Sequence, residues 1–125
     1  EDLARHYASG DLFVFASLTE TWGNVTGEAM ASGLAVLAYD YAAAAQLICC
    51  GHNGVRVRVD DRAGFVKQAV ALAARPEQLR ELGANAFEAS QQMGWPSIVD
   101  QVEQVYLRAL DSVQQSRASV RLATA

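Results

Sequence analysis

The chain has 125 residues, of which 51% are hydrophobic, 19% charged and 8% aromatic. This composition supplies enough apolar side chains for the core of one folded domain and excludes a mainly disordered chain. Ten Lys and Arg against fourteen Asp and Glu give a net charge of −4. Because the basic residues are scattered along the chain, the sequence shows no basic patch for nucleic acid or for an anionic membrane.

No segment of the sequence is predicted to enter or cross a membrane. The longest apolar stretch, residues 29–38, is broken by Ser32 and Gly33, and it is well short of the roughly twenty residues that a spanning helix needs. The chain opens on Glu1 and Asp2, where a signal peptide would have a basic region followed by an apolar one. We therefore expect a soluble chain in the cytoplasm.

The isolated cysteines and histidines are interpreted as structural. Cys49 and Cys50 are neighbours, too close for an ordinary disulfide and without a second pair for a zinc site, so we expect two small, semi-buried side chains in a reducing compartment. His6 and His52 have no partner at metal-ligand spacing. No metal site is predicted.

Apolar periodicity predicts alternating helices and strands, the pattern of a parallel sheet covered by helices. The expected elements of the first half are a helix at 2–8, a strand at 12–16 buried on both faces, a helix at 25–32, a strand at 34–39 and a helix at 40–50. A third strand at 55–59 alternates apolar and polar residues, so we place it near an edge. The predicted fold class is α/β, with a Rossmann-like parallel sheet and flanking helices.

The second half of the sequence is predicted to be helical. The expected helices span 62–74, 76–91 and 97–115, and residues 116–125 lack an apolar period and are predicted to be a frayed C-terminal tail. Residues 1–115 are then one domain. Three strands are few for a self-sufficient sheet, so we expect the chain to be part of a larger protein whose preceding elements are absent.

A polar loop at 17–24 joins the carboxyl end of the first strand to the next helix. Ligands of open α/β sheets bind at such positions. The backbone N–H groups of Val25 and Thr26, together with the helix dipole and the small Gly23, predict a seat for a phosphate.

Two carboxylates, Glu20 and Glu28, flank the helix start. With Asn24 as the N-cap, a capping box would place its acid at Gly27, so Glu28 misses that structural role by one residue. Glu28 could instead be a first-turn acid that complements the helix dipole, and Glu20 a plain loop carboxylate. Trp22 either stacks on a sugar or base or packs on the neighbouring helix.

The run from Tyr7 to Val36 resembles the donor-binding segment of retaining glycosyltransferases of the GT-B fold, family four. Its signature is two glutamates with seven residues between them, here Glu20 and Glu28. Residues 53–55, with Trp95 and Tyr106, resemble the closing segment of the same family, and we interpret Trp95 and Tyr106 as core and docking residues. The resemblance implies the C-terminal, nucleotide-sugar-binding half of a GT-B enzyme.

The resemblance also implies a role for each residue of the loop. Glu20 takes the catalytic position and hydrogen-bonds hydroxyls of the donor hexose. The amides of Gly23, Asn24 and Val25 approach the sugar and the diphosphate, and Thr26 offers an amide, and a hydroxyl as well, near a phosphate.

Glu28 by the same resemblance holds the two vicinal hydroxyls of the ribose, a task suited to a carboxylate. Asp40 and Tyr41, at the end of the second strand, are further candidates near the nucleotide. The implied substrates are a nucleotide sugar and an acceptor glycan or lipid-linked sugar, with no metal or other cofactor. Residues 29–36 and 38–44 resemble GDP-mannose-dependent mannosyltransferases, and a UDP-sugar is the alternative donor.

Three positions depart from the family pattern. Gly27 stands where a bulky apolar residue is usual, Ala35 replaces a common proline, and Gln46 occupies a region that often carries an Arg-Glu pair. The cations that neutralise the donor diphosphate, and the N-terminal acceptor domain, belong to a part of the family that this chain does not contain. We expect the protein in the cytoplasm or peripheral at the inner membrane face. One alternative function is a catalytically incomplete binding module that needs an acceptor domain from elsewhere. The other is an interaction protein that shares only the architecture.

Overall fold

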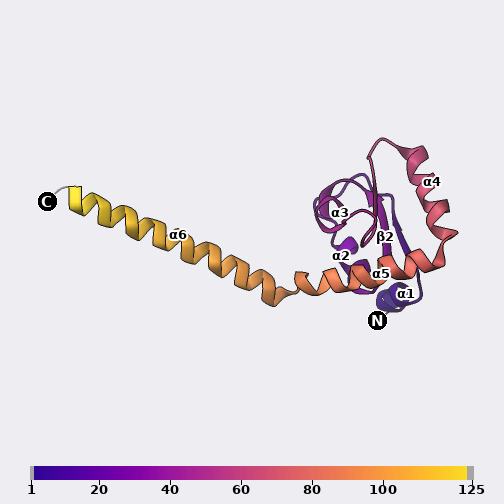
Figure 1. Cartoon of the computed structure of the whole chain (residues 1–125), viewed down its shortest axis with the longest axis horizontal. Helices are drawn as coiled ribbons and strands as arrows, with labels where there is room; N and C mark the ends of the chain where they lie inside the picture. Colours follow the sequence, from indigo (N-terminus) through magenta and orange to yellow (C-terminus); the bar gives the residue numbers. More distant parts are fainter. Residues whose placement is uncertain (1, 124–125) are drawn as a thin grey trace. The chain divides into compact units, whose positions relative to one another are not determined.

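The computed structural model describes residues 2–123, with side chains described as far as Gln115. The chain forms two compact units, Glu1–Gln92 and Met93–Ala125. The first unit contains a sheet with helices around it, and the second consists mainly of one long helix, α6 (Trp95–Ala123) (Figure 1). Among the described residues, no helix combines the length and hydropathy that crossing a bilayer would require.

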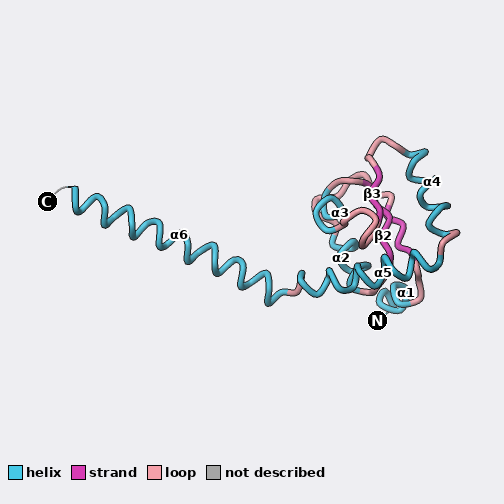
Figure 2. Tube along the Cα trace, viewed as in Figure 1, coloured by secondary structure: helices cyan, strands magenta, loops and turns pink. Residues whose placement is uncertain are grey.

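The sheet consists of three parallel strands, β1 (Leu12–Phe15), β2 (Ala35–Tyr39) and β3 (Val55–Val57), drawn in magenta in Figure 2. Their order is β1-β2-β3, so that β2 is central. Leu12 pairs with Ala35 and Leu37 pairs with Val55. The parallel sheet confirms the predicted α/β class, and the position of β3 confirms that the third strand lies at an edge.

Burial differs sharply between the strands. All five residues of β2 are buried, as expected for a central strand covered on both faces. The prediction that the first strand is also buried on both faces is wrong, since Val14 is 48% exposed and the other residues of β1 are only partly buried. The apolar run predicted a strand correctly, but its place at the sheet edge decides how much of it is covered.

The helices of the first unit appear in the predicted order with different ends. They are α1 (Asp2–Ala8), α2 (Asn24–Ala31), α3 (Ala42–Leu47), α4 (Arg62–Ala73), α5 (Pro76–Ser90) and the short 3₁₀ helix η1 (Gln91–Met93). The largest difference is α3, predicted over 40–50. It ends early because Ile48 is extended, while the Asn53 side chain donates to the carbonyl of Leu47 and accepts from the amide of Cys49. These bonds satisfy backbone groups that a longer helix would have used.

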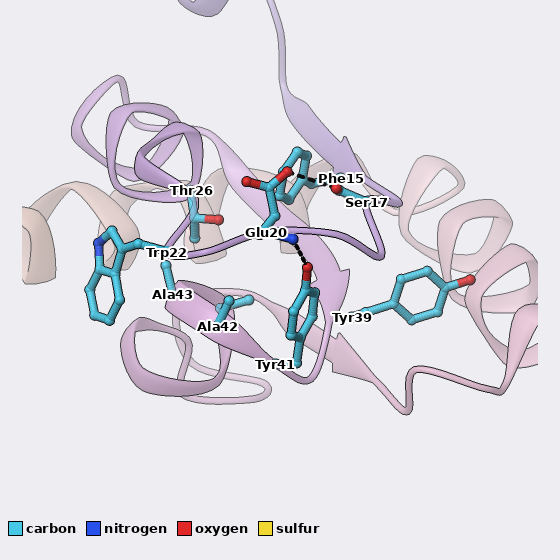
Figure 3. A pocket seen from close by; sticks show the side chains of 10 residues that line it. Phe15, Ser17, Glu20, Trp22, Thr26, Tyr39, Tyr41, Ala42 and Ala43 are labelled. Carbon is cyan, nitrogen blue, oxygen red and sulfur yellow. Dashed lines mark hydrogen bonds between the residues drawn. The ribbon is translucent and has the colours of Figure 1, made fainter.

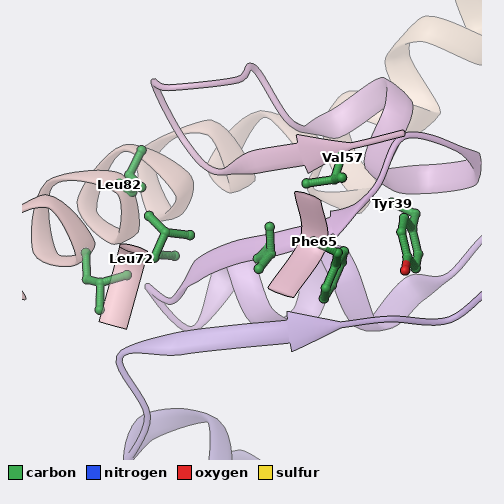
Figure 4. Packing of buried hydrophobic residues seen from close by; sticks show 8 residues of the cluster. Tyr39, Val57, Phe65, Leu72 and Leu82 are labelled. Carbon is green, nitrogen blue, oxygen red and sulfur yellow. The ribbon is translucent and has the colours of Figure 1, made fainter. Parts of the chain in front are cut away.

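The main core lies between β2, β3 and the helices α4 and α5 (Figure 4). Its buried members are Ala35, Leu37, Tyr39, Val57, Phe65, Leu72, Leu79 and Leu82. The rings of Tyr39 and Phe65 pack with their centroids 4.5 Å apart. Burying a large apolar side chain contributes about 1.5–3 kcal/mol, so this cluster stabilises the strand from which the candidate site extends.

Helix α5 approaches the sheet very closely at Gly83. A Cβ atom at this position would lie 2.2 Å from the carbonyl oxygen of Gly33, a distance that no side chain can adopt without movement of the backbone. Gly33, which ends the turn after α2, has a φ of 76°, in the left-handed region that favours glycine. Two glycines therefore set the separation between α5 and the start of β2.

Helix α6 extends further than the sequence predicted. The predicted helix ends at Gln115, whereas α6 continues to Ala123, so the predicted tail at 116–125 is wrong as far as Ala123, and residues 124–125 lie outside the described residues. No Gly or Pro interrupts residues 97–123, and residues such as Arg, Gln and Ala favour a helix without an apolar face. Trp95 and Tyr106 are 78% and 68% exposed, so their interpretation as core residues is wrong.

The cysteine prediction also needs correction. Cys49 and Cys50 are both exposed and unpaired rather than semi-buried. They follow the shortened α3 and lie in the turn before β3, where the Cys50 sulfur accepts a hydrogen bond from the backbone N–H of Arg56 at 3.1 Å. His52 meets the side chain of Asn85, whose Nδ2 donates to the His52 carbonyl at 2.8 Å and lies 3.4 Å from the ring Nδ1.

Candidate functional site

A pocket opens where β1 and β2 end (Figure 3). The carboxyl ends of parallel strands meet at one edge of a sheet, which is where open α/β sheets bind ligands. The pocket has a volume of about 200 Å³, including space open to solvent. Its lining comes from β1, the following loop, α2, the end of β2 and α3, with the residues Phe15, Ser17, Glu20, Trp22, Thr26, Tyr39, Tyr41, Ala42, Ala43 and Ala44.

Glu20 is the charged residue of this lining. Its Oε1 accepts a hydrogen bond from the Ser17 hydroxyl at 2.7 Å, and its backbone N–H donates to the Tyr41 hydroxyl (Figure 3). The side chain is half-buried, and within the described part of the chain its Oε2 has no hydrogen-bond partner. The carboxylate is therefore held in place with one oxygen available to accept from a ligand.

The start of α2 differs from the sequence prediction. Asn24 was expected to be the N-cap, but that position belongs to Gly23, which has φ 89° and ψ 62° and makes no side-chain cap bond. Asn24 is the first residue of the helix. Glycine takes this left-handed conformation without the cost that a Cβ atom would bring. The helix therefore starts from a left-handed glycine and not from a side-chain cap by Asn24.

The backbone donors of this turn are only partly available. The N–H of Thr26 donates to the carbonyl of Gly23 at 3.1 Å, so the expectation that this amide is free for a phosphate is wrong. The N–H groups of Asn24 and Val25 have no backbone acceptor among the described residues, as is usual at a helix start. Thr26 is 1% exposed and turns its side chain toward the pocket (Figure 3).

Glu28 does not line the pocket that contains Glu20. It is exposed and lies four residues after Asn24 on α2, a spacing that places both side chains on one helix face. The first turn of α2 carries no acidic residue, so the interpretation of Glu28 as a first-turn acid is wrong. The Tyr7 hydroxyl donates to Glu28 Oε2 at 3.3 Å. The structure thus separates the two glutamates into a pocket and an adjoining exposed face.

The turn between β2 and α3 forms the opposite wall of the pocket. Ala42 has a φ of 50°, a left-handed conformation that is unusual for a residue with a Cβ atom. The N–H of Ala43 donates to the carbonyl of Trp22 at 2.7 Å. This bond and the one between Glu20 and Tyr41 tie the wall to the loop after β1. Trp22 is 42% exposed at the pocket.

Arg56 on β3 forms hydrogen bonds to residues on both sides of this turn. Its Nη1 donates to Asp40 Oδ1 at 2.9 Å and to the carbonyl of Ala45 at 2.7 Å. Hydrogen bonding to Cys50 and the charge of Asp40 raise the pKa of Arg56 above its ordinary value, against the opposing effect of burial. Asp40, a further candidate for ligand contact, is therefore engaged with Arg56, whereas Tyr41 lines the pocket directly.

Sequence reasoning missed several parts of the pocket. Ser17 was placed only in the polar loop and residues 42–44 only within the 38–44 resemblance, with no role in the site, and Arg56, which links β3 to the β2–α3 turn, was not singled out. The carboxyl-end rule led to Asp40 and Tyr41 after the second strand, and extending it by one turn of chain would have included residues 42–44. Nothing in the sequence pattern marks Arg56, because its partners lie 11 and 16 residues away.

A comparison with protein families decides the membership of this chain. Residues 1–75 match the family model described as "Glycosyl transferases group 1". The chain belongs to this family. As a group 1 glycosyltransferase domain it carries the two glutamates of the resemblance at Glu20 and Glu28, and a match in sequence over most of the first unit argues against an origin in shared architecture alone.

Individual relatives agree with this membership. The domain is 30% identical over 118 residues to a D-inositol 3-phosphate glycosyltransferase of Thermomonospora curvata, covering 94% of this chain and 27% of the relative. It is 34% identical over 113 residues to an enzyme of the same name from Gordonia bronchialis, covering 88% of this chain and 24% of the relative. The chain thus spans about a quarter of the length of these group 1 glycosyltransferases.

A solved structure agrees as well. Sucrose-phosphate synthase from Thermosynechococcus elongatus superposes with a TM-score of 0.76 at 28% identity, over 89% of this chain and 28% of that one. The likeness confirms the predicted fold class and the resemblance to the C-terminal part of a GT-B glycosyltransferase. The chain is therefore a group 1 glycosyltransferase domain with an α/β, Rossmann-like sheet.

Proposed function

We propose that this chain is the donor-binding part of its glycosyltransferase and holds a nucleoside diphosphate sugar at the carboxyl edge of the sheet. The observation that carries the proposal is the placement of Glu20, whose carboxylate lines the pocket with Oε2 unpartnered among the described residues. Membership in the family implies a nucleotide-sugar donor. A carboxylate that accepts from hydroxyl groups suits the hexose of such a donor.

The pocket accounts for only one end of this ligand. The pocket is shallow and open, and its volume of about 200 Å³ includes space open to solvent, so it can contact only the end of such a ligand at its mouth. We assign the hexose to the pocket beside Glu20 and Thr26. The diphosphate then lies by the amides of Gly23, Asn24 and Val25 outside it, with Thr26 contributing its hydroxyl rather than its amide.

Glu28 completes the proposed donor site as the acceptor for the ribose hydroxyls. It lies one turn after Asn24 on the same face of α2 and outside the lining of the hexose pocket, so we assign it to the part of the donor beyond the diphosphate. A nucleotide sugar is an extended ligand with its ribose on the far side of the diphosphate from the hexose. The separation of the two glutamates therefore fits a role for each at a different end of the donor.

In the whole protein, we propose transfer of the hexose with retention to a hydroxyl of a glycan or lipid-linked sugar. The bond from the anomeric carbon to the diphosphate breaks, the acceptor oxygen bonds to the same face, and the departing diphosphate receives the acceptor proton. This chain contributes by positioning the donor and by electrostatic stabilisation. GDP-mannose is the proposed donor, with a UDP-sugar as the alternative, and no metal is required. The names of the relatives add D-inositol 3-phosphate as an acceptor to test.

The charge of the pocket favours a second candidate, a binding module that is catalytically incomplete alone. Glu20 is the charged residue among the described lining residues, and the lining includes no Lys or Arg. A diphosphate beside a carboxylate is repelled unless cations lie close by. The relatives are about four times longer than this chain, so an N-terminal acceptor domain could supply those cations.

Calorimetric titration of the 125-residue chain with GDP, UDP, GDP-mannose and UDP-glucose tests the proposal. Loss of a hydrogen bond to a charged group costs about 1–3 kcal/mol, so Glu28→Ala is expected to weaken both the nucleotide and the sugar nucleotide about 5- to 150-fold. Glu20→Ala is expected to weaken the sugar nucleotide and leave the nucleotide unchanged. Glu88→Ala, which removes an exposed acid from α5, is the matched control.

The outcomes separate the two candidates. An equal loss of both ligands in Glu20→Ala contradicts the assignment of Glu20 to the hexose. Absence of binding by the folded wild-type chain contradicts an autonomous donor site and favours the incomplete module. Binding of one nucleotide base only, lost in Glu28→Ala and kept in Glu88→Ala, supports the donor site and identifies the base.

A further inference from the structure

The contact between Tyr7 and Glu28 joins two elements that are distant in sequence. Tyr7 lies near the end of α1 and its hydroxyl donates to Glu28 Oε2 across 3.3 Å, over a separation of 21 residues. Glu28 is exposed, and within the described residues its Oε1 has no hydrogen-bond partner. Of the described side chains, Tyr7 is thus the one that constrains the carboxylate to which we assign the ribose.

The ring of Tyr7 is itself fixed to the sheet. It packs edge-on against Phe13 of β1, with centroids 5.7 Å apart and planes at 69°. Phe13 stacks in turn on Phe15 at 5.6 Å, and Phe15 lines the hexose pocket. Aromatic pairs in these geometries stabilise the packing beyond the burial of their rings. The hydroxyl that meets Glu28 is therefore carried on a row of rings that ends in the pocket wall.

Tyr7 acts as a hydrogen-bond donor in this contact. Burial, followed by the charge of Glu28 and the hydrogen bond to it, raises the pKa of Tyr7 above its ordinary value of 10.0, so the hydroxyl stays protonated at neutral pH. An ionised carboxylate offers about four acceptor sites on two oxygens. Tyr7 occupies one of them and leaves Oε1 open to a further donor.

We propose that Tyr7 is a positioning residue that holds the Glu28 carboxylate in the orientation that accepts the ribose hydroxyls. The inference rests on the proposed function, in which Glu28 binds the ribose. A glutamate side chain on an exposed helix face samples several rotamers, and fixing such a side chain on binding costs about 0.5–1.5 kcal/mol. A partner that fixes it beforehand removes part of that cost from the binding step.

The test is Tyr7→Phe in the 125-residue chain, which keeps the ring packed on Phe13 and removes only the hydroxyl. Dissociation constants are measured for a ribonucleoside diphosphate and for its 2′,3′-dideoxy counterpart. The variant is expected to bind the ribonucleotide about 2- to 12-fold more weakly than the wild type and the dideoxynucleotide equally well. Tyr106→Phe removes the hydroxyl of an exposed tyrosine on α6 and is the control.

A Glu28→Gln background sharpens the measurement. Tyr7→Phe is expected to have little further effect there, because the carboxylate that the hydroxyl orients is gone. Equal weakening of both nucleotides by Tyr7→Phe, or no change in either, overturns the positioning role while the ribose site stands. A wild-type chain that binds the two nucleotides equally well overturns the ribose site itself, and one that binds neither overturns a ribose site that works in this chain alone; either result overturns the inference.

Discussion

Helices α5 and α6 carry similar amphipathic patterns but differ in how far their apolar side chains are buried. In α5, Leu79, Leu82 and Ala86 are buried at 7%, 2% and 0% exposure. In α6, no side chain between residues 95 and 115 is buried, and Val102 and Val105 are 49% and 59% exposed. Apolar spacing therefore identifies the face of a helix that can be buried, but burial requires a complementary surface, which β2 supplies to α5.

The largest effect on stability is expected from shortening a buried side chain in β2, the strand that α5 covers. Leu37, in the middle of β2, is fully buried. We expect Leu37→Ala to lower the free energy of unfolding by about 2–5 kcal/mol, because it removes buried apolar contacts and leaves a cavity. Chemical denaturation followed by circular dichroism measures the change. A loss below about 1 kcal/mol would show that β2 is not the centre of the core.

The close approach of α5 gives the next largest effect. Gly83→Ala places a Cβ atom against the backbone of Gly33 and is expected to destabilise the chain by about 1–3 kcal/mol through overpacking. Gly27→Ala is the matched control, since the nearest atom to its new Cβ, from Leu47, lies 3.9 Å away. The control is expected to gain up to about 1 kcal/mol from helix propensity. Similar effects of both substitutions would contradict the tight contact.

Helix α4 lies between the two extremes, with Phe65 and Leu72 buried and the rest of the helix more exposed. Its start depends on Asp61, whose Oδ1 accepts from the N–H of Gly64 at 2.8 Å. We expect Asp61→Ala to reduce the free energy of unfolding by about 1 kcal/mol through loss of the N-cap. Asp60→Ala, one residue earlier and outside the cap, is the control and is expected to change stability less.

The smallest effect is expected on α6. Val105→Ala removes two methyl groups from an exposed position and improves helix propensity slightly. We expect the free energy of unfolding to change by no more than about 0.5 kcal/mol. The thermal midpoint is expected to shift correspondingly little. A loss comparable with that of Leu37→Ala would mean that the apolar face of α6 is covered in solution.

The sequence predicted more of the fold than of the site. The order of helices and strands followed from apolar periodicity, because this pattern acts over a few residues. The ends of α3 and α6 were predicted wrongly, since the Asn53 side chain ends α3, and α6 continues past Gln115 although the sequence there has no apolar period. The loop after the first strand was located correctly. The opposite wall of the pocket, around Tyr41, comes from the turn between β2 and α3, which lies further along the chain.

For the two glutamates, the sequence alone established their spacing, their place after the first strand and the family to which the chain belongs. The tertiary structure decided that Glu20 enters a pocket beside Ser17 and Tyr41, while Glu28 stays on an exposed face and meets Tyr7. Spacing along a chain fixes only local geometry. Which side chains share a pocket depends on how the strands pair and how the helices pack on them, and those contacts join residues far apart in sequence.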